Sequence, residues 1–544
     1  MTLFSVFVAG AALAVSHSQP DARHSKQPNV IFFIADDMLP RHFNCLPQGK
    51  GRNLTPNIDR LADEGVVMLQ QHCASPICTP SRYNVLTGTY ASRAQNAWFT
   101  ETTGELKGQT KVEFNTHIVK GQPTLPALLQ RAGYTTGMVG KNHVVEAHGL
   151  KRFKNFDDSA RDPKNVSILK SNHDHVCQAM REIGFDVVDR VYHNNPDFLG
   201  LHEVAVQNMD WITEGGISFL EHASKQRVGV EENQKKPFFL YFATTVPHGP
   251  TKEKRSWNAD PLISPVGYLS EAPKGQPARH TIPERLKVAG VPVNDDTCNM
   301  LWLDDAVGAL LATLEKTGEI DNTVIFFYSD HGQMAKGTLY QGGVHNPCIV
   351  WRKGGFPVGK TSDALTHIVD FAPTILDMAG ADSGGTAFDG ESYLPILNGE
   401  PQSGERVMYF ELGYARAVRK GNFKYLALRY PADVKSMTPE ARRTALEEWN
   451  AERRRKHLRV VTDDPSAPFS HLTAVPGGGD AERGSTGSRP GYFDRDQLYD
   501  LSRDPNEQEN LASSPEYAVK LQEMKRLLDE HVRALPGTFG EFGK

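Results

Sequence analysis

The chain has few cysteines and no excess of basic residues. Only six of its 544 residues are cysteine, at positions 45, 73, 78, 177, 298 and 348. This excludes a cysteine-dense scaffold, and the pairing of a single bridge cannot be read from the sequence. The net charge is −5, from 60 Lys and Arg against 65 Asp and Glu. Overall charge therefore gives no support to nucleic-acid binding, and an acidic substrate would have to be met by a few local Lys and Arg residues.

The N-terminal apolar run is short. Residues 3–15 are apolar except for one serine, whereas a helix needs about 20 residues to cross a bilayer. We therefore expect no membrane span here. The run has the length of a signal-peptide core, and Ala14-Val15-Ser16 offers a small-x-small cleavage pattern, although no Lys or Arg precedes it. We expect residues 1–18 to be a cleaved signal peptide and the protein to be exported, to the periplasm or the extracellular space.

The length indicates more than one domain. A single hydrophobic core stops growing at about 250–300 residues, and the apolar content of 39 % is that of an ordinary globular protein. We expect an N-terminal α/β catalytic domain at 28–398. A smaller α+β domain should follow at 399–544, with a four-stranded antiparallel sheet. Residues 463–490 are rich in Gly, Ser, Pro and charge, which predicts a mobile insertion.

Unbroken β-branched and aromatic runs predict the large sheet. Residues 29–35, 237–245 and 323–329 read as strands buried on both faces, as in a parallel sheet covered by helices. Residues 348–351 read as a fourth strand. Residues 153–198 have weak periodicity and many polar positions. We expect loops with one helix there, near the mouth of the site.

Carboxylates follow two of these strands directly. Asp36 and Asp37 end the first, and Asp330 with His331 ends the third. Open α/β sheets bind ligands at the carboxyl ends of their strands. Carboxylates at this density repel one another unless a cation joins them, and oxygen ligands suit Ca²⁺ or Mg²⁺. A zinc phosphatase site would need more histidines in ligand positions.

One short motif is more specific than any of these patterns. Cys78-Thr79-Pro80-Ser81-Arg82 is followed by Leu86-Thr87-Gly88. In this motif the chain resembles the type I, formylglycine-dependent sulfatases of the alkaline-phosphatase-like superfamily. Matching segments run in the family's order from residue 30 to about residue 511. They include 133–143, 237–248, 329–347 and 370–376.

The resemblance implies a modified nucleophile. A formylglycine-generating or anaerobic sulfatase-maturating enzyme would convert Cys78 to formylglycine, leaving five cysteines. One hydroxyl of the hydrated aldehyde would bind the metal and attack sulfur, with Asp330 able to accept its proton. The alcohol leaves, and the second hydroxyl then expels sulfate, with His143 as the base. Serine in this position would remain trapped as a stable sulfate ester.

The resemblance also assigns the remaining site residues. One Ca²⁺, with Mg²⁺ as the alternative ion, would be held by Asp36, Asp37, Cys78, Asp330 and His331. The positions that bind the sulfate group are Arg82, Lys141, His248 and Lys336. Of these, His248, alone or with Lys336, would protonate the leaving oxygen.

Three positions depart from the family pattern. Asn142 stands where the family often has Trp, and Gln341 and His345 replace the Glu and Arg of a Tyr-Glu-Gly-Gly-x-Arg pattern. The core chemistry does not need these positions, but leaving-group recognition can change with them. Trp98 and Phe99 are either a sugar-stacking surface or ordinary packing. The sequence His173-Asp174-His175 is a second, weaker metal-like cluster.

We therefore expect a sulfatase that releases sulfate from a sulfated carbohydrate. The alternatives are a broad arylsulfatase, a phosphonate monoester or phosphodiester hydrolase with the same nucleophile, and a non-catalytic sulfoglycan-binding protein in which Cys78 stays unmodified. No matched residue identifies the sugar, the sulfated hydroxyl, exo or endo action, or the oligomeric state.

Overall fold

A computed structural model describes residues 27–544 except 232–233, 253, 457 and 481. The expected signal peptide, residues 1–18, lies outside the described residues. None of the described helices has the length and apolar composition needed to cross a membrane.

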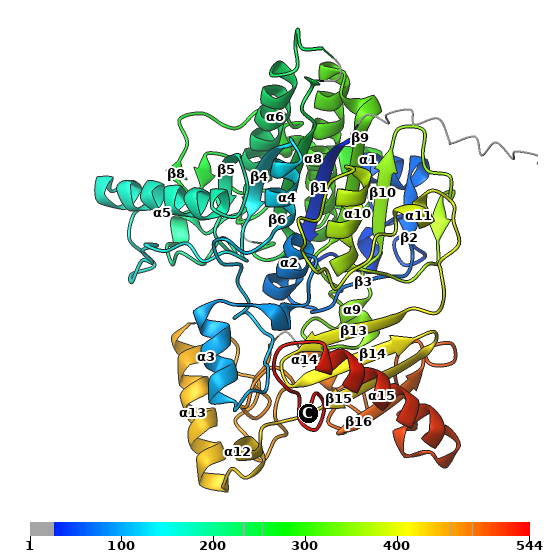
Figure 1. Ribbon diagram of the computed structural model, residues 1–544. Helices are drawn as coiled ribbons and strands as arrows, with labels where there is room; N and C mark the ends of the chain where they lie inside the picture. The colour runs from blue at the N-terminus through cyan, green and yellow to red at the C-terminus, as the bar shows by residue number, and fades with distance from the viewer. Residues whose placement is uncertain (1–26, 232–233, 253, 457, 481) are drawn as a thin grey trace, which may run out of the picture.

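A large twisted sheet forms the centre of the molecule (Figure 1). Its eight strands are, in spatial order, β11 (Thr361–Ser362), β2 (Val66–Met68), β10 (Cys348–Arg352), β9 (Thr323–Ser329), β1 (Asn29–Asp36), β6 (Phe238–Pro247), β4 (Thr135–Lys141) and β5 (Val187–Tyr192). The pairings are parallel except those of β10, which runs antiparallel to both β9 and β2. The expected mainly parallel sheet is confirmed.

Strand β1 shows why helices cover both faces. All eight of its residues are buried, and successive side chains enter two different apolar clusters. Phe32 meets Phe371 edge-on with ring centroids 4.9 Å apart, whereas Phe33 stacks on Phe242 at 4.7 Å on the opposite face. Such a strand is stable only between two helical layers.

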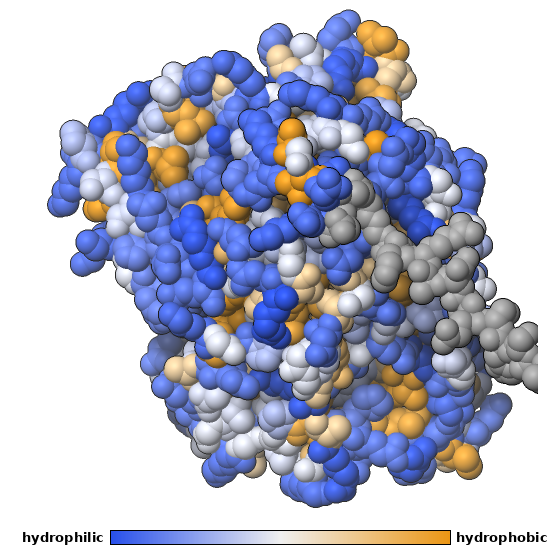
Figure 2. Space-filling view, turned by 45° about the horizontal axis from the view of Figure 1, so that its top comes forward, coloured by the Kyte–Doolittle hydropathy of each residue, from blue (hydrophilic) through white to orange (hydrophobic). Residues whose placement is uncertain are grey.

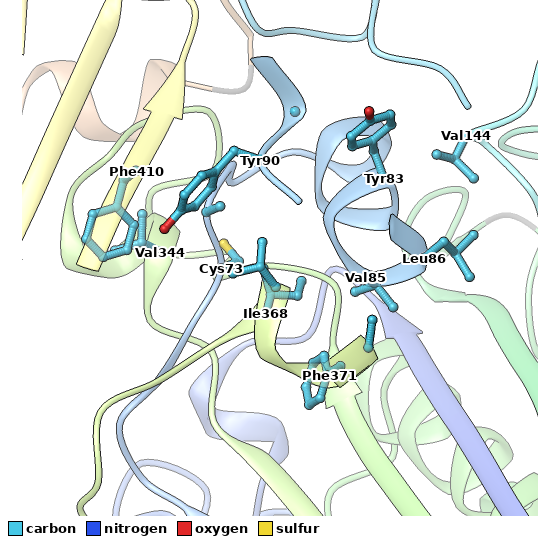
Figure 3. Packing of buried hydrophobic residues seen from close by; sticks show 14 of the residues in the cluster. Cys73, Tyr83, Val85, Leu86, Tyr90, Val144, Val344, Ile368, Phe371 and Phe410 are labelled. Atoms are coloured by element: carbon cyan, nitrogen blue, oxygen red, sulfur yellow. The ribbon is translucent and has the colours of Figure 1, made fainter. Parts of the chain in front are cut away.

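Two groups of helices supply these layers. Apolar residues of α1 (Pro56–Glu64), α6 (Met209–Lys225) and α8 (Asp295–Thr317) join the cluster of Phe33. Those of α2 (Cys78–Thr87), α4 (Leu125–Arg131), α5 (Pro163–Arg181) and α10 (Phe371–Met378) join the cluster of Phe32. Figure 3 shows part of this second cluster, where Val85 of α2 lies on the side of the helix that faces Phe371.

A second sheet carries the C-terminal part of the chain. Its four antiparallel strands are β13 (Val407–Leu412), β14 (Ala415–Lys420), β15 (Phe423–Leu428) and β16 (Asp496–Asp500), as expected. Helix α15 (Ala518–Arg533) packs on it with Leu521, Met524 and Leu528 buried. The cluster of Phe32 continues into this sheet, where it includes Phe410 (Figure 3). The two sheets therefore share an apolar core, and the boundary at 398/399 stays a prediction.

The remaining helices and two short two-stranded sheets complete the fold. The other helices are α3 (Ala97–Glu105), α7 (Ile282–Val288), α9 (Gln341–Val344), α11 (Leu394–Leu397), α12 (Ala432–Lys435), α13 (Pro439–Arg455) and α14 (Arg483–Thr486). Two-stranded pairs join β3 (Gln71–His72) to β12 (Thr366–His367) and β7 (Ile263–Ser264) to β8 (Gly267–Tyr268). The face seen in Figure 2 is mostly hydrophilic, with apolar residues in separate small groups.

Candidate active site

The register of two parallel strands brings the carboxylates together. Ala35 of β1 lies opposite Ser329 of β9, so both strands end at the same edge. Asp36, Asp37 and Asp330 each place an oxygen within 4.8 Å of the others. The backbone N–H of Asp37 also donates a hydrogen bond to Asp330 Oδ1 at 3.2 Å. This edge is where sequence analysis expected a ligand.

Helix α2 carries Cys78 to the same place. Cys78 is its first residue, and its Sγ lies 3.7 Å from Asp36 Oδ1 and 3.6 Å from His331 Nε2. The hydroxyl of Ser81 donates a hydrogen bond to the carbonyl oxygen of Asp330, which fixes the helix against β9. The signature motif thus contains both the thiol and one of the contacts that position it.

The glycine of the motif ends this helix. Gly88 has a φ of 65°, and its N–H bonds to the carbonyl oxygen of Asn84. A side chain here would be strained, and its Cβ would lie only 2.5 Å from the ring of Phe388. Only glycine fits this end of α2 without rearrangement.

Two cations are buried behind the carboxylates. Lys141, the last residue of β4, places its Nζ 2.6 Å from Asp36 Oδ2. Arg82 lies one helical turn after Cys78, and its NH2 is 3.3 Å from Asp36 Oδ1 and 3.5 Å from Asp330 Oδ2. All four side chains are fully buried.

Two further groups face Asp37 from the more open side. Lys336 donates to both Asp37 oxygens, at 2.7 and 2.9 Å, and lies 3.7 Å from Cys78 Sγ. His248 Nε2 lies 3.5 Å from Asp37 Oδ2. These two side chains are 14 % and 20 % exposed, so a ligand can reach them.

Sequence reasoning missed Asn195. Its side-chain oxygen accepts a hydrogen bond from Lys141 Nζ at 2.6 Å, and its amide nitrogen lies 3.4 Å from His248 Nε2. Asn195 belongs to a His193-Asn194-Asn195-Pro196 sequence just after β5. That polar cluster was the available signal, but β5 lay hidden in a segment that we expected to contain only loops and one helix.

Charge and burial compete in this cluster. Burial would raise the pKa of Asp36, but the charges of Lys141, His248 and Arg82 hold it well below its ordinary value. Burial raises the pKa of Asp330, and the charges of Asp36 and Asp37 act in the same direction. Three buried carboxylates and one imidazole nitrogen form a donor set with hard oxygen ligands, which fits Ca²⁺ or Mg²⁺.

His143 lies beside the cluster. It is partly buried, its ring stacks on Phe114 at 5.9 Å, and its Nδ1 is buried without a hydrogen-bond partner. Burial lowers its pKa, and the charges of Lys141 and Arg82 lower it further. A neutral imidazole with an unpaired ring nitrogen is suited to accept a proton.

The three residues that depart from the family pattern form hydrogen bonds that involve backbone groups. Asn142 accepts hydrogen bonds from the N–H groups of Val144 and Val145, at 3.1 and 2.9 Å. His345 Nε2 lies 2.6 Å from the carbonyl oxygen of Leu69. Gln341 begins α9, and its N–H donates to Glu507 at 2.6 Å.

The other sequence candidates lie outside the carboxylate cluster. Trp98 is 48 % exposed, whereas Phe99 is buried in the core. On α5, His173 accepts a hydrogen bond from the N–H of Val191, and His175 bonds to Ser171 of its own helix. None of the groups of described residues that can hold a metal includes this helix.

Buried carboxylates, cations and a helix-borne cysteine thus meet at one edge of an α/β sheet, an arrangement suited to the hydrolysis of an anionic ester. The family model described as Sulfatase matches residues 28–381. The chain therefore belongs to the sulfatase family, and it is a sulfatase.

Two relatives and one solved structure are similar to this chain over most of its length. The chain is 24 % identical to an N-acetylglucosamine-6-O-sulfatase of Bacteroides thetaiotaomicron, covering 96 % of this chain and 89 % of the relative. It is 25 % identical to the N-acetylgalactosamine-6-sulfatase of Mus musculus, over 78 % of this chain and 75 % of that protein. The solved phosphonate monoester hydrolase from Silicibacter pomeroyi shares the fold with a TM-score of 0.53 and 18 % identity, over 94 % of this chain and 96 % of that one.

Proposed function

We propose that this sulfatase hydrolyses a sulfate ester of a carbohydrate, R–O–SO₃⁻ + H₂O → R–OH + SO₄²⁻ + H⁺. The nucleophile is formylglycine, made from Cys78 by a maturation enzyme that brings its own oxidant. The observation that carries the proposal is the meeting of Cys78 Sγ with Asp36, His331 and Lys336, each within 3.7 Å. The two sugar sulfatases among the relatives support a carbohydrate substrate.

A divalent cation completes this site. Asp36, Asp37, Asp330 and His331 would hold it together with residue 78, and we propose Ca²⁺, with Mg²⁺ as the alternative. When bound, it supplies a Lewis acid that lowers the pKa of the attacking hydroxyl. The buried carboxylates fit it because their mutual repulsion falls when a cation lies between them.

The protein's own cations receive the sulfate group. Arg82 and Lys141 are fixed by Asp36, so their positive charges are in place before the substrate arrives. Lys336 and His248 lie on the open side at Asp37. His248, alone or with Lys336, protonates the leaving oxygen, and His143 removes the proton that allows sulfate to be expelled.

A sulfate-release screen tests this function. The enzyme, produced together with a maturation enzyme, is incubated with sulfated mono- and oligosaccharides, an aryl sulfate and an aryl phosphonate, beside a Cys78→Ala variant. We expect release from a sulfated sugar and none from the variant. Faster turnover of the phosphonate would favour the phosphonate hydrolase, and turnover of aryl sulfate alone would favour the arylsulfatase.

Peptide mass analysis tests the nucleophile separately. Conversion of the Cys78 thiol to the formylglycine aldehyde lowers the mass of its peptide by about 18 Da. An intact thiol in an enzyme that still releases sulfate would refute the nucleophile. An intact thiol with glycan binding but no release would favour the non-catalytic binding protein.

The localisation follows from the N-terminal segment. We propose that residues 1–18 direct export to the periplasm or the extracellular space. Determining the N-terminal residue of the protein secreted by an expressing cell tests this. Protein that stays in the cytoplasm with Met1 retained would contradict it.

A further inference from the structure

A cavity of about 990 Å³ borders the carboxylate site. Its floor includes His331 and Ser329, and its rim includes Arg41, Arg52 and Arg489. The cavity thus lies between the end of β9, the segment that follows β1 and loops of the C-terminal part of the chain. Among the described residues that line the cavity there is no Asp or Glu. Local positive charge is therefore concentrated here, although the whole chain carries a net charge of −5.

Two of the three arginines have charge available for a ligand. Arg41 is already paired with Asp296, at 3.2 Å. Arg489 lies over the ring of Tyr340 at 5.3 Å and has a buried Nε without a hydrogen-bond acceptor. Arg52 is exposed. Neither Arg52 nor Arg489 forms an ion pair within the described part of the chain.

The rest of the wall suits a sugar rather than a free ion. Met38, Phe43 and Met334 add apolar surface, and Met334 is 63 % exposed. Gln341 presents a neutral amide at the position where the family pattern often has Glu. A carboxylate there would lower the positive potential of the cavity.

We infer that this cavity binds a second anionic group of the substrate, a sulfate or a carboxylate on the same or the neighbouring sugar, through Arg52 and Arg489. The inference rests on the proposed function and narrows its substrate class to polyanionic carbohydrates. Guanidinium groups bind sulfate and carboxylate oxygens with paired N–H donors. His331 lines the cavity and also lies 3.6 Å from Cys78 Sγ through its Nε2, so the cavity and the carboxylate site are direct neighbours.

Calorimetry on the inactive Cys78→Ala protein tests binding without catalysis. The probes are N-acetylglucosamine-6-sulfate, D-glucosamine-2-N,6-O-disulfate, and a disaccharide of glucuronate with N-acetylglucosamine-6-sulfate. We expect the two doubly charged sugars to bind about tenfold more tightly than the singly charged one, and less so at high salt. Preference for only one of them would identify sulfate or carboxylate as the group recognised.

The arginines are tested in the same background. An Arg52→Gln/Arg489→Gln double variant should lose the preference, whereas Arg443→Gln, an exposed arginine on α13, should keep it. Unchanged melting temperatures show that both variants are folded. Equal binding of all three sugars, or a preference that survives the double variant, would overturn the inference.

Failure of the proposed function can be distinguished from failure of this inference. If the mature enzyme releases no sulfate from any probe, the proposed function is wrong, whatever the calorimetry shows. If it does release sulfate, the double variant should reduce the ratio of kcat/KM for the disulfate to that for the monosulfate by about tenfold. An unchanged ratio in a folded double variant would contradict the role of the cavity alone.

Discussion

The ammonium group of Lys141 lies 2.6 Å from a carboxylate oxygen of Asp36, and neither side chain is exposed. Strand β4 provides one partner and strand β1 the other, with β6 between them. The pair therefore connects the ends of two strands that do not touch in the sheet. It also fixes a positive charge beside Cys78, because Asp36 lies 3.7 Å from the thiol.

Replacing Lys141 should damage both stability and catalysis. Lys141→Met leaves a buried carboxylate with one fewer cation, and breaking a buried pair in this way costs about 3–5 kcal/mol. We expect a lower melting temperature and a fall in kcat of about 100-fold or more. The control is Lys120→Met, since Lys120 is 73 % exposed. A Lys141 variant with wild-type turnover would contradict a role in binding sulfate.

Removing divalent cations should destabilise the folded protein. After chelation we expect the melting temperature to fall, and titration with Ca²⁺ or Mg²⁺ to restore it by mass action. The ion that restores it at the lower concentration is the preferred one. Asp37→Asn removes one proposed ligand and should weaken this response. Native mass spectrometry showing no bound ion at saturating concentrations would argue against the metal site.

Asn195 should position two catalytic groups at once. Its side chain contacts both Lys141 and His248, so Asn195→Ala frees the orientation of both. We expect kcat/KM to fall about tenfold with a small change in melting temperature. Asn398→Ala, at an exposed position, is the control. Equal kinetics for the two variants would show that Asn195 only fills space.

His367 should make the protein sensitive to acid. Its Nε2 lies 3.1 Å from the carbonyl oxygen of Tyr409 in β13. Burial lowers its pKa to about 3, with the charges of Arg406 and His531 lowering it and that of Asp370 opposing them.

The direction of this pH effect follows from comparing the pKa of His367 in the folded and unfolded chain. The unfolded chain has a histidine pKa of about 6.5 and so binds the proton first as the pH falls. Stability from His367 is therefore complete above pH 6.5 and is lost as the pH falls from there toward about 3. In His367→Gln, chemical unfolding should depend less on pH over this range, whereas His280→Gln, at an exposed position, should behave as wild type. Equal pH dependence in all three proteins would rule this out.

Sequence patterns predicted the strands whose side chains are apolar on both faces, namely β1, β6 and β9. They did not reveal β5, because an edge strand with Asp189 and Arg190 resembles a loop. They also left the direction of β10 open. Residues 330–347 separate β9 from β10, and a connection of this length allows either direction.

The site was predictable to a similar degree. The strand ends predicted that the carboxylates meet, and the resemblance carried by the signature motif added Cys78 to them. Asn195 and the cavity arginines escaped because each comes from an irregular segment. Side chains in such segments come together only through tertiary packing, which a local sequence pattern does not predict.

All ten residues of α2, from Cys78 to Thr87, are buried. A second enzyme cannot reach a thiol enclosed by α2, His331 and Lys336 without unfolding this region. Any conversion of Cys78 must therefore happen while the chain is still being made or is not yet packed. Whether a molecule is active would then depend on whether Cys78 was modified before the chain folded. Folded molecules that missed the modification would stay inactive when the maturation enzyme is added later.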